Sequence, residues 1–237
     1  MDINLALIGA FLGAGLSVGI GALGAASGVG YASGRALEAM TRQPTASPVI
    51  LRTMLIGQAI TETSSIFALL VSLMLLFKGG DSSVTIMLAN LSAGACIGLG
   101  ALGSGVGAGL PVGSAVEGIG RKPENSSGLM ISMLIGQAVT QTAVIFALVV
   151  SLLLLFQVHA ETMMHNVAIL GAGLAMGFGA IGPGVGAGIT AQMATKAIAY
   201  NSETSKLVTT TMLLGQSVSQ STAIYSLVIA MILMFMF

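Results

Sequence analysis

Long apolar stretches alternate with short polar segments along the whole chain. Each apolar stretch exceeds the roughly 20 residues that an α-helix needs to cross the hydrocarbon core of a bilayer. The pattern predicts six membrane-spanning helices, at residues 5–36, 49–77, 84–117, 128–156, 166–196 and 206–237. We therefore expect an all-α membrane protein.

The polar segments group the six expected helices into three tandem pairs. Short polar loops lie inside the pairs, at residues 39–47, 118–127 and 197–205. Linkers at residues 78–84 and 157–165 join one pair to the next. Each pair has an even number of spans, so all three hairpins insert in the same orientation, unlike the inverted repeats of many secondary transporters. We expect parallel units that lie side by side in a ring or an array, divided as 1–80, 81–159 and 160–237.

The cationic residues indicate how the hairpins are oriented. Most of them cluster around the loops inside the pairs, namely Arg35, Arg42, Arg52, Arg121, Lys122, Lys196 and Lys206. Only Lys78 lies on the opposite side. The positive-inside rule therefore places these loops in the cytoplasm and both termini outside.

The composition excludes several classes of protein. The chain is 55% hydrophobic and 7% charged, with a mean hydropathy of +0.98, which is too apolar for a water-soluble globular domain. It has no basic patch, so we expect no nucleic-acid partner. The single cysteine, Cys96, excludes a disulfide within the chain and indicates a small buried apolar residue. Asp2 stands where a signal peptide has basic residues, so we expect the first apolar stretch to be retained.

One carboxylate lies in the middle of an apolar stretch. Glu62 belongs to the segment GQAITETSSIFALLVSLMLLF, and related segments follow at a period of 79 residues, with Gln141 and Gln220 at the equivalent positions. A carboxylate at membrane depth is costly and usually marks an ion pathway. The alternative is a structural acid paired with a base, but no Lys or Arg lies at that depth. The two glutamines either fill the space of lost carboxylates or help to hold a cation at a neighbouring Glu62 site.

The first helix of each pair is rich in glycine. The first set, Gly19, Gly21, Gly24, Gly28 and Gly30, recurs as Gly98, Gly100, Gly103, Gly107 and Gly109, and again as Gly177, Gly179, Gly182, Gly186 and Gly188. Small residues let helix backbones approach closely in membranes. Glycine on several faces predicts several close neighbours, as in an inner ring of helices. A single GxxxG dimer face explains fewer of these glycines, and a phosphate-binding loop lacks the required strand and lysine.

These features together resemble the rotor-ring c subunit, or proteolipid, of F-type ATP synthases. The most specific segments are GVGYASGRALEAMTRQP and GQAITETSSIFALLVSL in the first repeat, and GQSVSQSTAIYSLVIAMIL in the third. The resemblance covers nearly the whole chain three times, whereas the usual F-type protein is a single hairpin. Fused hairpins that have lost carboxylates are also similar to the duplicated proteolipids of V-type pumps.

The resemblance implies a role for each of these elements. Glu62 is expected to carry the ion, neutral while it faces lipid and ionised opposite a basic residue of the stator a subunit. The loop residues Arg42, Gln43 and Pro44, with Arg121, Lys122 and Pro123, are expected to dock on the central stalk. Tyr200, Asn201 and Ser202 depart from that loop pattern. The expected partners are copies of the same chain in a ring, the a subunit, central-stalk subunits and lipid, in the plasma membrane of a prokaryote. The chain itself is expected to be non-catalytic and to need no cofactor.

The identity of the carried ion depends on the ligands around Glu62. Thr63 supplies a hydroxyl at a position that sodium-type relatives use, and Ser64 could hold a water molecule. Those relatives also use a glutamine of the first helix, where this chain has Val29, Ala108 and Ala187. Phe67 replaces their supporting tyrosine, although Tyr225 keeps it in the third repeat. We therefore predict H+ as the transported ion, with Na+ as the alternative.

One carboxylate in three hairpins predicts a low ratio of ions to ATP, which favours ATP-driven pumping. If an ordinary single-hairpin c subunit joined the same ring, it would restore carboxylate sites. The alternative functions are a stand-alone membrane channel and a structural proteolipid. We expect Glu38 and Glu117, whose third equivalent is Lys196, to be solvated or ion-paired. We do not expect His159 and His165 to bind a metal, because they lack suitably spaced ligands.

Overall fold

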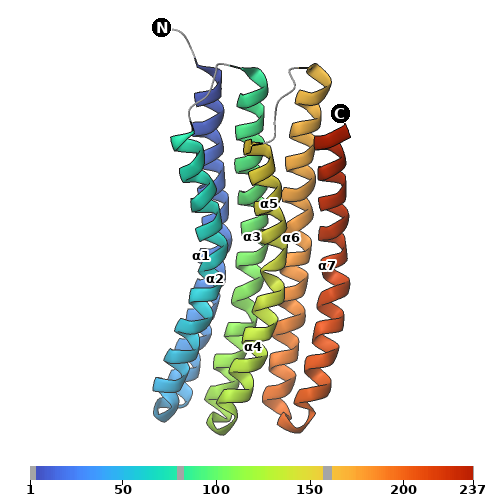
Figure 1. Cartoon of the computed structure of the whole chain (residues 1–237). Coiled ribbons are helices and arrows are strands. Elements are labelled where there is room, and N and C mark those ends of the chain that lie inside the picture. The colour runs from blue at the N-terminus through green and yellow to red at the C-terminus, as the bar shows by residue number, and fades with distance from the viewer. Residues whose placement is uncertain (1–3, 79–82, 157–161, 237) are drawn as a thin grey trace.

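The computed structural model describes residues 4–78, 83–156 and 162–236. Its long helices form three hairpins that stand side by side (Figure 1). Hairpin 1 consists of α1 (Leu5–Arg42) and α2 (Ser47–Phe77), and hairpin 2 of α3 (Val84–Arg121), α4 (Ser126–Thr140) and α5 (Thr142–Phe156). Hairpin 3 consists of α6 (Met163–Tyr200) and α7 (Ser205–Met236). The predicted all-helical fold of six spans in three tandem hairpins is confirmed, with α4 and α5 forming one span that is interrupted at Gln141.

The turns inside the hairpins are shorter than the predicted loops. The first helix of each hairpin continues through most of the polar segment and ends at Arg42, Arg121 or Tyr200. Ion pairs one turn apart support two of these extensions, Arg42 with Glu38 at 3.8 Å and Arg121 with Glu117 at 2.5 Å. A single turn of 3-10 helix then opens each second helix, at Pro44–Ala46, Pro123–Asn125 and Ser202–Thr204.

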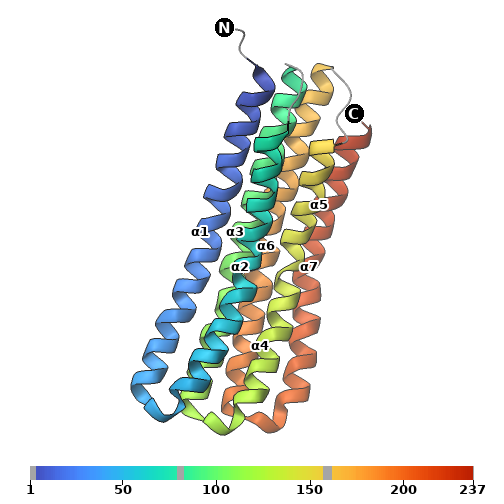
Figure 2. The same cartoon turned by 60° about the vertical axis from the view of Figure 1, so that its left-hand side comes forward.

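The three glycine-rich helices α1, α3 and α6 pack next to one another, and the second helices lie along one side of them (Figure 2). Their backbones approach so closely that a Cβ atom added at Gly24 or Gly103 would collide with the backbone of the next hairpin, at Leu102 or Ile181. Only glycine permits this contact, because any side chain would push the helices apart. Helix α3 lies in the middle and is the most buried of the set.

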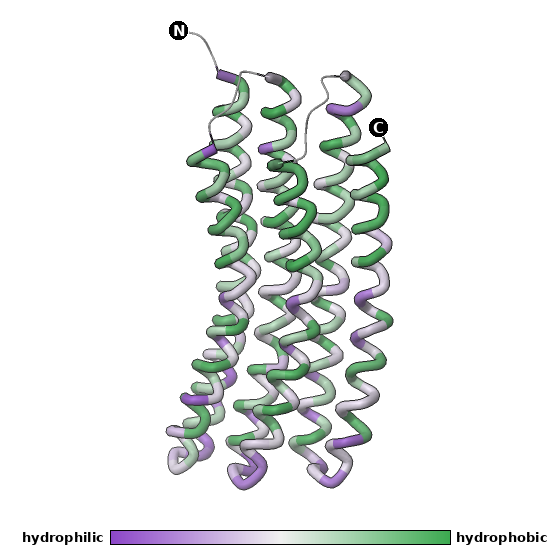
Figure 3. The backbone as a smooth tube through the Cα atoms, viewed as in Figure 1, coloured by the Kyte–Doolittle hydropathy of each residue, from purple (hydrophilic) through white to green (hydrophobic). Residues whose placement is uncertain are grey.

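The distribution of apolar groups fits a bilayer. The interior between the helices consists largely of alanine and glycine, whereas large apolar side chains such as Leu23 and Leu214, each 65% exposed, point outward. Polar residues gather at the hairpin turns, at the lower end of the molecule in Figure 3. Isolated large apolar residues on a soluble surface are normal, but outward-facing leucines along six long apolar helices indicate contact with lipid. The chain is a multi-pass integral membrane protein.

At the opposite end of the bundle, the Lys78 ammonium group follows α2 and donates a hydrogen bond to the backbone carbonyl of Leu155. Half-burial lowers the pKa of Lys78 because it disfavours the charged form. His165 is buried in the first turn of α6, while His159 lies outside the described residues. Among the described residues, no three His, Cys, Asp or Glu side chains form a metal-binding group.

Candidate ion-carrying site

Glu62 lies on α2, about halfway along the span, and its side chain is exposed. The Ser65 hydroxyl lies within 2.9 Å of both the carboxylate Oε2 and the backbone carbonyl of Glu62. Ser65 follows Glu62 by three residues, a spacing that brings side chains together on one face of a helix. Sequence reasoning missed this contact, although the spacing could have indicated it.

The two predicted ion ligands do not reach the carboxylate within the chain. The Thr63 hydroxyl donates to the backbone carbonyl of Ala59 at 3.3 Å, and the buried Ser64 hydroxyl donates to that of Thr61 at 3.0 Å. Both groups therefore satisfy carbonyls of their own helix. Their roles as ion ligands stay predictions.

The equivalents of Glu62 have a different environment. Gln141 and Gln220 are each only 7% exposed. The Gln141 side-chain amide donates to the backbone carbonyl of Ile60 at 2.9 Å, and the Gln220 amide donates to that of Val139 at 3.1 Å. Each glutamine thus reaches across to the second helix of the preceding hairpin, and the two contacts repeat with the same 79-residue period. These hydrogen bonds therefore link each hairpin to the one before it.

A second row of glutamines lies one turn earlier, in the recurring Gly-Gln pair of each second helix. The Gln137 amide donates to the carbonyls of Gly57 at 2.9 Å and Ala108 at 3.0 Å, so it ties three helices together. Gln216 repeats this contact with Gly136 and Ala187, each at 3.0 Å. Sequence reasoning missed this row, although its recurrence at 79-residue spacing was visible.

Gln58, the first member of this second row, makes different contacts. Its amide donates to the Ser33 hydroxyl at 2.7 Å and to the Val29 carbonyl at 3.4 Å, both within hairpin 1. Val29, Ala108 and Ala187, the positions without a first-helix glutamine, therefore each offer a backbone carbonyl to the second-helix glutamine of the same hairpin.

The five glycines predicted to pack helices divide into two groups. Gly21, Gly24 and Gly28 face neighbouring helices within the chain, where an added Cβ would meet Ala68, Leu102 or Gly105. Gly19 and Gly30 have nothing within 4 Å of an added Cβ. The second group lies on the outer edge of hairpin 1.

The predicted docking residues all lie at the end of the bundle that holds the hairpin turns. Arg42 closes α1, Gln43 follows it, and Pro44 opens the 3-10 turn. The Arg121 guanidinium lies 5.4 Å from the centre of the Tyr200 ring, and the Lys122 ammonium donates to the Tyr200 carbonyl at 3.1 Å. Pro123 opens the second 3-10 turn. Tyr200 thus ties hairpin 3 to hairpin 2, while Asn201 caps the third turn by accepting from the backbone of Glu203.

Comparison with known proteins gives the same repeat. The model of the ATP synthase C-subunit family matches three times, at residues 12–75, 91–154 and 170–233. The ATP synthase c subunit of Mesomycoplasma hyopneumoniae (strain 7448) is 53% identical over 70 residues, which are 30% of this chain and 68% of that protein. The c subunit of Petrotoga mobilis is 55% identical over 67 residues, 28% of this chain and 70% of its own length. That of Natranaerobius thermophilus is 46% identical over 74 residues, 31% of this chain and 85% of its own length.

Proposed function

The chain belongs to the C-subunit family of ATP synthases, as three c-subunit repeats in tandem, and from this premise we propose that Glu62 is the one group that carries the ion. A c subunit is part of the rotor of a rotary ATP synthase. In the part of the chain that the structure describes, Glu62 is the only acidic residue in the middle of a span. Gln141 and Gln220 cannot release a proton, and their amides are engaged with the backbone. This contrast carries the proposal.

The chemistry of Glu62 follows from its surroundings. Facing lipid, an ionised carboxylate is costly, so it is stable only when a proton or cation neutralises it. A cationic group of a stator protein favours the ionised form, and the carboxylate then releases its ion. Rotation between these two environments loads and unloads the ion. The Ser65 hydroxyl, 2.9 Å from Oε2, helps to orient the carboxylate.

We propose H+ as the carried ion. Within one chain, Ser65 is the hydroxyl that reaches the carboxylate, since the hydroxyls of Thr63 and Ser64 bond to their own helix. Sodium needs several oxygen ligands, whereas a proton needs only one acceptor. Na+ is the alternative, to be distinguished by competition.

One working site in each chain also sets the number of ions moved per ATP. In a ring of n chains, one turn moves n ions and is coupled to three ATP, so the ratio is n/3 ions per ATP. A ring of the same girth with a carboxylate in every hairpin would move three times as many. Moving one charge against 100 mV costs about 2.3 kcal/mol, so fewer ions per ATP allow a steeper gradient. The rotor is therefore suited to ATP-driven pumping.

The charged residues at the hairpin turns support the proposed orientation and partners. The hairpin turns with Arg42 and Arg121 face the cytoplasm and dock on the central stalk, and both termini lie outside. The third turn, with Tyr200, Asn201 and Ser202, contributes less, because it departs from the Arg-Gln-Pro pattern of the first turn. A stator protein supplies the cation opposite Glu62.

Carbodiimide labelling of the purified rotor, followed by peptide mapping, tests the proposal. The reagent attacks a protonated carboxyl group in an apolar setting, so we expect selective labelling of Glu62 that rises as the pH falls and ignores sodium. Protection of Glu62 by sodium at constant pH would show that the carried ion is Na+ and not H+. An unlabelled Glu62 at every pH would overturn its role as the ion carrier.

A further inference from the structure

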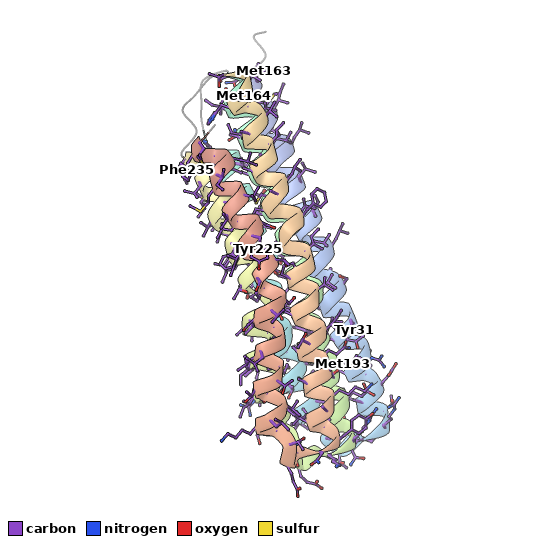
Figure 4. The ribbon with its side chains drawn as sticks, turned by 90° about the vertical axis from the view of Figure 1, so that its right-hand side faces the viewer. Tyr31, Met163, Met164, Met193, Tyr225 and Phe235 are labelled. Atoms are coloured by element: carbon purple, nitrogen blue, oxygen red, sulfur yellow. The ribbon has the colours of Figure 1, made fainter. Side chains whose placement is uncertain are left out.

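One hydrogen bond joins two hairpins that are not neighbours. The Gln192 side-chain amide of α6 donates to the Tyr31 hydroxyl of α1 at 2.7 Å, so hairpin 3 is bonded directly to hairpin 1. Figure 4 shows Tyr31 at the same level as Met193, the residue that follows Gln192. The hydrogen bonds between hairpins described above all join neighbouring ones, whereas this bond spans the whole row of three.

A glycine of α3 makes room for this Tyr31–Gln192 bridge. A Cβ added at Gly113 would collide with the Tyr31 ring and would lie 3.1 Å from the Cγ of Arg35, so the ring passes directly over this glycine. The Arg35 guanidinium lies 5.4 Å from the centre of the same ring, which is a cation–π contact. Hairpins 1 and 2 therefore position the tyrosine whose hydroxyl reaches hairpin 3.

The residues of the bridge depart from the internal repeat. Where the third repeat has Gln192, the first two repeats have glycine. Where the first repeat has Tyr31, the other two have the aliphatic residues Leu110 and Ile189. Each partner thus occurs once in the chain, in the repeat where it can reach the other. Hairpin 2 offers neither partner and supplies the glycine over which the bridge passes.

The bridge lies on the side of α3 that faces away from the second helices. A Cβ added at Gly118 would contact Leu129 of the second helix α4. Gly113 lies five residues earlier, and five residues turn an α-helix by about 140° beyond one full turn. Gly113, and the tyrosine ring above it, are therefore on the opposite side of α3 from α4.

The packing of the helices indicates that this side of the row is concave. The first helices α1, α3 and α6 pack closely against one another, whereas the second helices α2, α5 and α7 make much less contact among themselves. A row of hairpins that is packed more tightly along one side bends towards that side. The bridge joins the first and third hairpins across the shorter side, so it opposes flattening of the row.

We propose that the Tyr31–Gln192 bridge fixes the curvature of the row of hairpins and thereby sets how many chains close the ring. The inference rests on the proposed function of the chain as the ion-carrying subunit of a rotor ring. A flatter row closes only with more chains, and each added chain brings one more Glu62 and one third of an ion per ATP. Every chain contributes one bridge, so the effect of this bond is multiplied by the number of chains in the ring.

The mass of the intact rotor ring, measured by native mass spectrometry, tests the bridge. Tyr31→Phe removes the hydroxyl that accepts from Gln192 and keeps the aromatic ring over Gly113. Because the row can then flatten, we expect the ring mass to rise by at least one step of 23.7 kDa, the mass of one chain. A ring of unchanged or lower mass would overturn the inference.

A second variant and a matched control accompany this measurement. Gln192→Leu removes the other partner and should give the same increase, so it provides the test if Tyr31→Phe does not assemble. The double variant should give rings no larger than those of the single variants, because either substitution breaks the same bond. Thr190→Val removes a hydroxyl of α6 that donates to the Gly186 carbonyl of its own helix, and it should leave the ring mass unchanged. An equal increase in Thr190→Val would refute the role of the bridge.

Carbodiimide labelling of the same preparations separates this inference from the proposed function. Normal labelling of Glu62 with an unchanged ring mass in both bridge variants would refute the role of the bridge and leave Glu62 as the ion carrier. Absence of labelling in the unsubstituted protein would refute the carrier role itself. An unsubstituted protein that forms no ring would refute the inference together with the rotor function on which it rests.

Discussion

The first hairpin contrasts with the two that follow it in the residue that it carries in the middle of its second helix. In hairpin 1 the position holds Glu62, exposed at the outer edge, with Ser65 as its hydrogen-bond partner. In the other two hairpins it holds Gln141 or Gln220, buried and bonded to the backbone of the preceding hairpin. A group that must exchange an ion needs an accessible position, whereas a permanently neutral amide tolerates burial. In the described part of the chain, the one acidic residue in the middle of a span thus lies at an exposed position, where its surroundings can change.

Replacing Glu62 by glutamine removes this difference, and it should have the largest effect. Ion transport should fall to background, because three amides cannot bind and release an ion. The rotor should still assemble, since glutamine already occupies the equivalent position in hairpins 2 and 3. Transport by reconstituted vesicles, with ring assembly as the control, measures both. Transport that survives in Glu62→Gln would contradict the proposed role.

The reverse change places a carboxylate at the buried position between hairpins 1 and 2. At low pH the side chain of Gln141→Glu is protonated and donates to the Ile60 carbonyl as the amide does, so stability should be near that of the unsubstituted protein. As the pH rises, the native state must give up a proton that it holds more tightly than the unfolded state does, and stability falls by several kcal/mol. Thermal unfolding in detergent from pH 4 to 9 should show this loss. Glu62→Gln is the control, with no such dependence.

Glycines that pack against the neighbouring hairpin allow the same comparison between hairpin 1 and hairpin 2 to be made for helix packing. Gly109→Ala should destabilise the chain by about 1–3 kcal/mol, because the added methyl group meets the backbone at Gly28. Gly30→Ala, at the equivalent position on the open edge, should leave the melting temperature of the single chain unchanged and weaken its assembly. Equal effects on the single chain would show that the edge of hairpin 1 is not open.

The smallest effect is expected at the turns inside the hairpins. Arg121→Ala removes the exposed ion pair with Glu117 and the contact with the Tyr200 ring, which are worth no more than about 1 kcal/mol each at a solvated surface. Arg42→Ala removes only the weaker pair with Glu38. Melting temperatures should therefore rank Arg121→Ala slightly below Arg42→Ala, and a drop as large as that of Gly109→Ala would contradict this ranking.

The sequence predicted the fold because apolar length and a fixed repeat are strong signals in a membrane protein. The six spans, their pairing and the position of Glu62 all follow from them. The ends of the helices were wrong, because pairs such as Glu117 and Arg121 stabilise additional turns within polar segments. Helical spacing alone also did not show which neighbour a side chain meets. The contact of Gln137 with hairpin 1 became visible only when the helices were placed side by side. The contact of Ser65 with Glu62 lies within one helix, and the three-residue spacing could have indicated it.

The number of ions transported per ATP, divided by the number of chains in the ring, tests the account most directly. Flux and ATP hydrolysis can be measured on the same reconstituted complex, and the mass of the intact ring gives the number of chains. With Glu62 as the single carrier in each chain, the account predicts a quotient of one third. A quotient close to one, which is one ion for every hairpin, would contradict it.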